Sequence, residues 1–249
     1  MKDSISLVGT GKMALAIAEA LKDSFSIEIV GRNYEKLSTL KEAGFKAVTF
    51  EEFDPENKIV ILAVKPGALE SVAEKMEKKC HLLISVMAGV TLQQLKSRIK
   101  SRMYVRAMPN LAAIFKSSMT ALTGDEEAKF ESIKIFEKIG ELIWLESERE
   151  LDIATAIAGS GPAFLALVAE ALTDAGVKEG LKREQARKLV EGLFEGSAKL
   201  LKKRHPALLK EEVMSPAGTT AAGIEALEKC GVRAAMFMAV KEAFAKTQK

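Results

Sequence analysis

Histidine and cysteine are scarce in this chain of 249 residues, which contains two of each. The cysteines, Cys80 and Cys230, lie far apart and form no CxxC pair, so they provide neither a disulfide framework nor a metal-binding motif. The histidines, His81 and His205, are equally isolated, which argues against a zinc site and against a histidine-activated nucleophile. Free thiols in a reducing compartment are expected.

The chain also lacks a strong excess of either charge and a long apolar run. Its net charge of +3 is too small to indicate a nucleic-acid partner, and its densest basic cluster, 199–204, is typical of a solvated helix end. The apolar runs fall short of the roughly 18–20 residues that cross a bilayer. The first residues lead directly into a predicted strand, so we expect no signal peptide and a cytoplasmic protein without a membrane partner.

The first half of the chain alternates apolar strands with helices. Such continuous apolar strands are typical of a parallel sheet covered on both faces, so we predict a doubly wound α/β domain. The length of the chain allows a second domain as well. The predicted strands are Ile5–Val8, Ile27–Val30, Ile59–Val64, Leu82–Val86, Met103–Ala107, Met119–Leu122 and Leu142–Leu145, and the predicted helices are Met13–Leu21, Tyr34–Ala43, Pro66–Lys78 and Glu126–Ile139.

The sequence changes character near Ser147, after which we predict helices and no strand. The domains are therefore expected at residues 1–147 and 148–249. Pro162 suits the first turn of a helix and Gly176 suits a C-terminal cap. The helices expected after that cap are Arg183–Leu201, Ala207–Val213, Ala221–Lys229 and Val232–Ala245.

The segment Ala163–Ala171 is apolar on nearly all sides, which is typical of a buried helix. The next helix carries Gly192 and Gly196 on one face, and each glycine costs about 1 kcal/mol in a helix interior. Close approach of another helix would offset that cost. Either the helices of the same chain enclose the apolar helix or, as we favour, a second subunit covers it.

The segment Gly9-Thr10-Gly11-Lys12-Met13-Ala14 follows the first strand and begins the first helix. The first glycine permits a tight turn, the second lets the backbone approach a pyrophosphate, and Ala14 allows close packing of helix and strand. The helix N-terminus offers free N–H groups to a phosphate. The pattern indicates a dinucleotide site, although a tight turn without a ligand has the same form.

The second strand ends at Val30-Gly31-Arg32-Asn33, where an NAD-specific site usually has an acidic residue that binds the ribose hydroxyls. Glu28 lies inside the strand instead. A guanidinium at this point can bind a 2′-phosphate through two hydrogen bonds, so Arg32 favours NADP over NAD. The alternative is that Arg32 is a solvated residue at the start of the next helix.

Three further segments leave strands at the edge where open α/β sheets bind their ligands. These are Ala63-Val64-Lys65-Pro66, Val86-Met87-Ala88-Gly89 and Met108-Pro109-Asn110. Lys65 either reaches a cofactor phosphate or the substrate, or faces water. The small residues and Pro109 suit a nicotinamide that lies close to the backbone.

The second half contains two segments in which hydroxyl side chains meet a predicted helix start. They are Ser160-Gly161-Pro162 and Ser215-Pro216-Ala217-Gly218-Thr219-Thr220. Hydroxyls beside free helix N–H groups form a ready site for a carboxylate. Simple N-capping is the alternative, and it explains the second and longer segment less well.

In order along nearly the whole chain, these segments resemble the pyrroline-5-carboxylate reductase family. The most specific signature is Ser215–Thr220, where Ala217 replaces the family's usual glycine. The resemblance implies a Rossmann domain followed by an all-helical dimerisation domain, with an active site built between them across a homodimer. It rests on Gly9–Ala14, Ala63–Pro66, Met108–Asn110, Ala158–Ala163, Glu170–Leu172, Gly176-Val177, His205-Pro206 and Ser215–Thr220.

The resemblance also implies hydride transfer from NADPH, or from NADH, to the C=N carbon of 1-pyrroline-5-carboxylate, which gives L-proline. Thr220 is the expected donor to the ring nitrogen, the N–H groups of Gly218, Thr219 and Thr220 are expected to bind the carboxylate, and Ser160 is expected to help orient the substrate. No metal is expected. The expected cofactor-binding residues are Val8, Gly9, Thr10, Gly11, Lys12, Met13, Arg32, Asn33, Ala63, Val64, Lys65, Pro66, Val86, Met87, Ala88 and Asn110.

Two other functions stay open at this point. A β-hydroxyacid dehydrogenase has a similar architecture but needs a catalytic lysine on a long helix of the second domain. Lys178, Lys182 and Lys188 are nearby, and none lies in the apolar stretch. A nucleotide-sensing regulator without turnover would have no need of Ser215–Thr220. The size of the oligomer beyond a dimer is also open.

Overall fold

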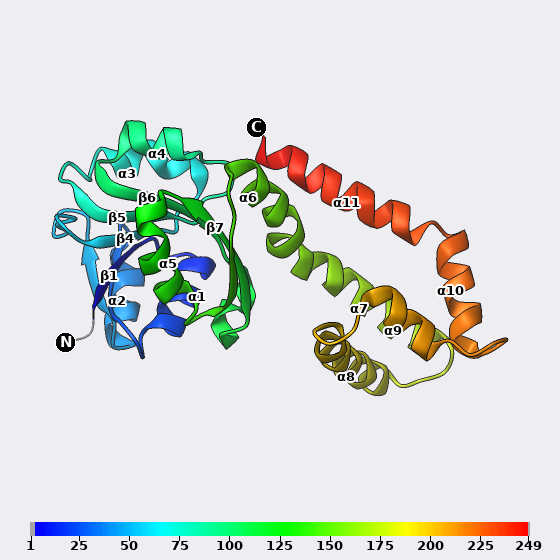
Figure 1. Cartoon of the computed structure of the whole chain (residues 1–249). Coiled ribbons are helices and arrows are strands. Elements are labelled where there is room, and N and C mark those ends of the chain that lie inside the picture. Colours follow the sequence, from blue (N-terminus) through cyan, green and yellow to red (C-terminus); the bar gives the residue numbers. More distant parts are fainter. Residues whose placement is uncertain (1–2, 249) are drawn as a thin grey trace. The chain divides into compact units, whose positions relative to one another are not determined.

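The computed structural model describes residues 3–248, which form two compact units (Figure 1). The first unit extends to Ser160 and includes the chain again from Ala243 onward, and the second unit is Gly161–Glu242. This division falls after the boundary expected at residue 148. The helix that begins at Glu148 packs against the sheet and therefore belongs to the first unit.

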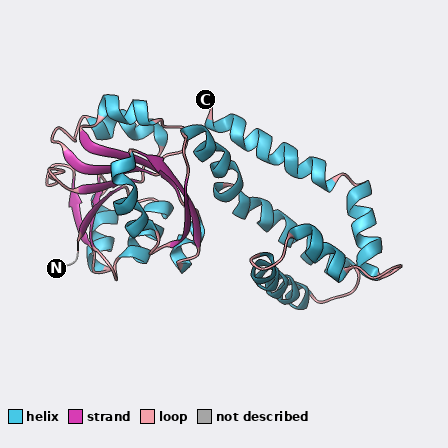
Figure 2. Ribbon diagram, in the orientation of Figure 1, coloured by secondary structure: helices cyan, strands magenta, loops and turns pink. Residues whose placement is uncertain are grey.

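Within the described residues, the first unit is built on an eight-stranded sheet in the order β3-β2-β1-β4-β5-β6-β7-β8. The strands are magenta in Figure 2. The strands are parallel except for the antiparallel pair β6 and β7. The order reverses at β1, which lies between β2 and β4, and such a switch point is where open sheets bind ligands. The strands are β1 (Ser4–Val8), β2 (Ser26–Gly31), β3 (Lys46–Thr49), β4 (Ile59–Leu62), β5 (Cys80–Ser85), β6 (Ser101–Met108), β7 (Ser118–Gly124) and β8 (Gly140–Trp144).

Helices cover both faces of this sheet. Successive residues of a strand point to opposite faces; thus Ile61 joins the core cluster beneath α1 and α5, whereas Val60 and Leu62 join the cluster beneath α3 and α4. Both faces are buried, which explains the uninterrupted apolar strands and confirms the predicted doubly wound fold. The helices are α1 (Lys12–Leu21), α2 (Tyr34–Glu42), α3 (Leu69–Ala73), α4 (Leu92–Arg98) and α5 (Lys129–Phe136), with 3-10 helices η1 (Pro66–Ala68), η2 (Leu111–Phe115) and η3 (Glu126–Ala128).

Two elements of the first unit differ from the prediction. The prediction did not include strand β3, because a segment of four residues that begins with Lys46 is too short to show a clear apolar pattern. The helix expected up to Lys78 ends at Ala73. The N–H groups of Lys75 and Met76 bond to carbonyls only three residues back, which tightens the chain out of the α-helical form.

A single helical run connects the sheet to the second unit. An α-helix begins at Gly161 with Pro162 in its first turn, as expected, but it continues a run that starts at Glu148. The run consists of α6 (Glu148–Ala154), the π-helical segment η4 (Thr155–Gly159) and α7 (Gly161–Lys178). In the π-helical turn, the N–H of Ser160 donates to the carbonyl of Thr155, five residues back. Such a wide turn accommodates Pro162, which lacks an N–H and would clash with a regular preceding turn.

The C-terminal cap of α7 is also displaced from the expected position. Gly176 lies inside the helix, and Gly180 adopts the positive φ of +110° that ends it. The N–H of Leu181 donates to the carbonyl of Gly176 and that of Gly180 to Val177, which is a Schellman motif. Gly176 is needed for packing instead, since a Cβ there would lie 3.3 Å from the Cβ of Ala186.

The run Glu148–Lys178 is the one helix among residues 3–248 that has the length and composition to cross a membrane. Its most apolar window has a mean hydropathy of 1.6, so the expectation that no segment reaches this length is wrong. Only 17% of that window is buried within the chain. Such an exposed apolar surface is typical of an interaction surface.

The second unit has little core of its own. Helix α7 packs against α8, yet the buried side chains of Gly161–Glu242 are only those of Thr173, Ala186 and Val190. Apart from the adjacent residues and backbone of α8 itself, no described atom lies within 4 Å of a Cβ placed at Gly192 or Gly196. The further helices are α8 (Arg183–Leu201), α9 (Pro206–Val213), α10 (Thr219–Lys229) and α11 (Val232–Thr247), of which α11 belongs to this unit up to Glu242. The exposed apolar side chains include Leu165, Leu167, Leu189, Leu193, Leu208, Phe237 and Met238.

Candidate active site

The turn between β1 and α1 has the geometry of a phosphate-binding loop. Gly9 has a φ of +133°, and a Cβ there would clash with the carbonyl of Ala63, which directly follows β4. Gly11 occupies the N-cap position of α1 and provides no side-chain cap, so the first N–H groups of the helix stay available. The buried Ala14 packs the helix against the sheet. This turn fits a pyrophosphate, which needs both the close backbone and the free N–H groups.

The end of β2 lies beside this turn. A Cβ on Gly31 would lie 2.9 Å from Cγ2 of Thr10, so the glycine keeps the phosphate-binding turn in place. Arg32 follows it and is exposed, as a residue that meets a ribose phosphate must be. The side chain of Asn33 accepts a hydrogen bond from the N–H of Lys36 at 2.9 Å and thereby caps α2.

The segments after β4 and β5 lie at the same edge of the sheet, since β1, β4 and β5 are parallel neighbours. Lys65 is exposed and is the N-cap residue of η1. After β5, Met87 is buried and its N–H donates to Oγ of Ser85 at 3.2 Å, whereas Ala88 is exposed. The second loop therefore offers Ala88 and its backbone to a ligand.

The side chain of Asn110 is engaged inside the protein. Its Oδ1 accepts from the N–H of Ala112 at 3.0 Å, and its Nδ2 donates to the carbonyl of Ala158 at 3.1 Å. The residue is buried. Asn110 therefore joins the end of β6 to the π-helical segment. For its predicted contact with the cofactor, the side chain has left only the second hydrogen of Nδ2 and the second lone pair of Oδ1.

The loop before α10 contains the expected carboxylate-binding segment. Ala217 adopts the left-handed conformation with a φ of +55°, so the chain takes a turn that favours glycine despite its Cβ. The N–H of Gly218 donates to the carbonyl of Ser215 at 3.0 Å and is not free for a ligand. Gly218 is the N-cap residue and provides no side-chain cap, so the N–H groups of Thr219 and Thr220 stay available.

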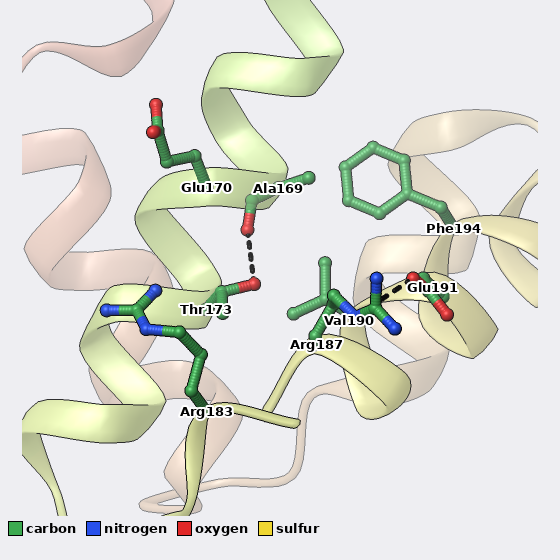
Figure 3. Close-up of a pocket in the computed structure, with 8 residues that line it drawn as sticks. All are labelled: Ala169, Glu170, Thr173, Arg183, Arg187, Val190, Glu191 and Phe194. Atoms are coloured by element: carbon green, nitrogen blue, oxygen red, sulfur yellow. Dashed lines mark hydrogen bonds and ion pairs between the residues drawn. The ribbon is translucent and has the colours of Figure 1, made fainter. Parts of the chain in front are cut away.

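A separate groove of about 440 Å³ lies between α7 and α8 (Figure 3). Val190 and Phe194 provide its apolar wall, and Thr173 donates to the carbonyl of Ala169 within it. Arg187 pairs with Glu191 at 3.6 Å beside that wall. None of the residues predicted for the active site lines this groove.

One cluster of charged residues was not anticipated. Arg106 on β6 is only 1% exposed and donates to Glu148 at 2.8 Å and to Asp152 at 2.9 Å. The signal was present, because an arginine inside an apolar strand needs a partner and two carboxylates four residues apart share one face of a helix. Their pairing across more than forty residues could not be inferred from the spacing alone.

Comparisons with known proteins support the two-part organisation. Residues 148–249 match the family model described as pyrroline-5-carboxylate reductase dimerisation. Residues 4–89 match the model described as NADP oxidoreductase, coenzyme F420-dependent. The first unit is therefore an NADP-binding oxidoreductase domain, and the helices that follow contain a dimerisation domain.

Relatives match nearly the whole chain. Pyrroline-5-carboxylate reductase of Thermus thermophilus is 38% identical and covers 96% of this chain and 95% of its own length, and that of Helicobacter pylori strain J99 is 36% identical with 97% and 98% covered. The crystal structure of the Streptococcus pyogenes enzyme has a TM-score of 0.88 at 31% identity, with 98% of both chains covered. A Plasmodium falciparum pyrroline carboxylate reductase with NADP bound has a TM-score of 0.84 at 29% identity, with the same coverage. The chain therefore belongs to the pyrroline-5-carboxylate reductase family, whose members are NAD(P)H-dependent oxidoreductases.

Proposed function

We propose that the loop before α10 binds 1-pyrroline-5-carboxylate while the first unit binds the reductant, and that the product is L-proline. The observation that carries this proposal is the uncapped N-terminus of α10 directly after the left-handed Ala217. The N–H groups of Thr219 and Thr220 point along the helix axis and carry its partial positive charge. A carboxylate is the part of this substrate that such a site favours.

Thr220 is the proposed hydrogen-bond donor to the ring nitrogen. Thr220 is partly exposed and lies in the first turn of α10, next to the N–H groups that would hold the carboxylate. As the C=N carbon is reduced, the nitrogen gains electron density and takes up one proton. An imine nitrogen is basic enough to accept it from a hydroxyl that exchanges with water, so no histidine is required.

The first unit fits a dinucleotide at the turn that contains Gly9, where a Cβ would clash with the carbonyl of Ala63 and the chain runs close to the segment after β4. When bound, NAD(P)H supplies the hydride that reduces the C=N carbon. We propose NADPH as the preferred form, with Arg32 binding the 2′-phosphate. The remaining contacts are assigned to the turn from Val8 to Met13 and to the segments Ala63–Pro66 and Val86–Ala88.

The exposed apolar surface of the second unit supports a homodimer as the working form, and further assembly of dimers is compatible with it. The second subunit of this dimer would bury the apolar side chains of α7, so a membrane is not required to cover them. We propose a cytoplasmic location on that basis. Ser160 is half-buried at the end of the first unit, and we propose for it a secondary role in orienting the substrate.

A pair of substitutions at Thr220 tests the proposed donor. Thr220→Ala removes the hydroxyl and keeps the backbone N–H, so kcat should fall by about a hundredfold or less while KM for the substrate changes little. Thr220→Ser should restore much of the turnover. Wild-type turnover of Thr220→Ala would mean that the residue only begins the helix, and equal loss in both variants would mean that the methyl group matters instead.

The activity itself is tested by following NADPH and NADH absorbance with 1-pyrroline-5-carboxylate. Oxidation that depends on the substrate and yields proline supports the proposal. A hydroxyacid with the oxidised cofactor is the control for a dehydrogenase. Turnover of the hydroxyacid alone, or cofactor binding without any turnover, would contradict it.

A further inference from the structure

An ionic cluster around the buried Arg106 connects β6, α6 and α4, and its Glu148 side chain is partly exposed. Arg106 on β6 donates to the carboxylates of Glu148 and Asp152, both on α6. The same Oε1 of Glu148 that binds Arg106 also accepts the N–H of Leu92 at 2.8 Å. Leu92 is the first residue of α4, so one carboxylate oxygen joins the start of that helix to the buried arginine.

The N–H of Leu92 closes the loop that follows β5. At the other end of this loop, the N–H of Val86 donates to the carbonyl of Leu62 at 3.0 Å and the N–H of Met87 donates to Ser85. The loop between these ends contains the exposed Ala88. Thr91 and Gln94 cap the far end of the loop locally, and the contact with Glu148 is the hydrogen bond that connects this end to α6.

The carboxyl-terminal segment approaches the same place. A Cβ on Gly89 would lie 3.7 Å from the carbonyl oxygen of Thr247, and Nε2 of Gln248 donates to Asp152 at 3.1 Å. Gly89 has a φ of +73°, so the loop depends on an unusual backbone conformation. These contacts all lie within the first unit and converge on the loop from the side of the ionic cluster.

The cluster is costly as a means of stabilising the fold. Arg106 is buried, and its Nε has no hydrogen-bond partner among the described residues. Replacing buried ion pairs with apolar residues is often neutral or favourable for stability, so such a pair is weak evidence for a purely structural role. The geometric effect of the cluster is more specific, because Arg106 holds Oε1 of Glu148 in the position where it accepts the N–H of Leu92.

We propose that Glu148, oriented by Arg106, is a positioning residue for cofactor binding, acting through the N–H of Leu92 to hold the loop Val86–Val90. The inference rests on the proposed contact of Val86–Ala88 with the cofactor. Without the carboxylate, the start of α4 has no polar anchor at Leu92 and the loop samples conformations that the dinucleotide does not fit. The affinity for NADPH falls, whereas the binding of the imine substrate is unaffected.

Three variants of the full-length chain test this role through the dissociation constant of NADPH, measured by calorimetry, and through steady-state kinetics. Glu148→Ala should weaken NADPH binding by roughly ten- to a hundredfold, the effect expected for losing one hydrogen bond to a charged group, with KM for the substrate and kcat within about twofold of wild type. Glu148→Gln keeps an acceptor for Leu92 and should recover most of the affinity. Glu150→Ala, on the same turn of α6, is the matched control and should bind NADPH as wild type does.

The outcomes separate this inference from the cofactor assignment on which it rests. Ala88→Val places bulk on the exposed part of the loop and should weaken NADPH binding by itself. If Ala88→Val has no effect, the loop is not part of the cofactor site and the assignment fails. If Ala88→Val weakens binding but Glu148→Ala does not, only the positioning role is refuted. Equal losses of affinity for cofactor and substrate in Glu148→Ala would also refute it, since a general loss of structure predicts that pattern.

Discussion

Replacing Gly218 with alanine tests the carboxylate-binding loop most directly. A Cβ at this position would clash with Oγ of Ser215 and would lie 3.1 Å from the carbonyl of that residue. Backbone strain is not the cause, since the φ of −82° at Gly218 suits alanine. The conflict is steric. Rotation of the Ser215 side chain relieves the clash with its Oγ, but the 3.1 Å contact with its carbonyl requires the loop to shift.

The expected loss follows from which groups move. A shift of the loop weakens the 3.0 Å bond from the N–H of Gly218 to Ser215 and displaces the N–H groups of Thr219 and Thr220 from the proposed position of the substrate carboxylate. Each hydrogen bond to a charged group contributes about 1.5–3 kcal/mol, so losing one raises KM for 1-pyrroline-5-carboxylate by roughly ten- to a hundredfold. The KM for NADPH should stay unchanged, because the cofactor is bound by the first unit.

Steady-state assays of two further variants complete the test. Gly223→Ala adds a methyl group to the same helix where no described atom lies within 4 Å, so it should leave KM unchanged and stabilise the helix by up to about 1 kcal/mol. Ser215→Gly combined with Gly218→Ala removes the clashing hydroxyl and should recover part of the affinity. If Gly218→Ala alone binds the substrate as wild type does, the loop does not hold the carboxylate.

Three other predictions concern the cofactor, the assembly and the acid stability of the protein. Arg32→Ala should raise KM for NADPH by roughly ten- to a hundredfold and leave that for NADH nearly unchanged; equal effects in steady-state assays would reject the 2′-phosphate contact. Gly196→Leu should give monomers or aggregates in light scattering, and an active wild-type monomer would contradict the proposed dimer. Burial acts to raise the pKa of Glu28, but hydrogen bonds from Lys46 and Lys58 outweigh it and hold that pKa below its usual 4.5. The stability from this carboxylate is therefore complete above that value and is lost as the pH falls through the lowered pKa, so urea unfolding of Glu28→Gln should depend less on pH between pH 7 and about pH 3 than that of wild type.

The sequence alone determined most of the first unit. Its strands are apolar on both faces, and only a sheet with helices on both sides buries them, so the fold class could be derived from runs such as Ile59–Val64. The turn at Gly9 could be derived too, because the spacing of its glycines reports a local backbone requirement. Local chemistry of this kind needs no knowledge of distant contacts.

Short elements and helix ends were decided by the tertiary structure. Strand β3 forms because β2 offers it a partner edge, although its own sequence carries a weak signal. Pro162 is a good helix starter by its covalent geometry, yet the π-helical turn before it lets the helix continue from Glu148. Ala217 adopts a glycine-like conformation because the surrounding turn requires it.

In the functional site too, the sequence indicates the residue types, whereas the tertiary structure decides which groups are paired. The residues proposed to carry the chemistry, from Gly9 to Thr220, could be selected from the sequence because their proposed roles depend on hydroxyls, free N–H groups and small side chains. The sequence could not reveal that the N–H of Gly218 is already bonded to Ser215, that the side chain of Asn110 holds Ala158, or that Arg106 is paired with Glu148. A hydrogen bond forms only between groups within about 3 Å, and for the pairs Asn110–Ala158 and Arg106–Glu148 the folding of residues forty or more positions apart sets that distance.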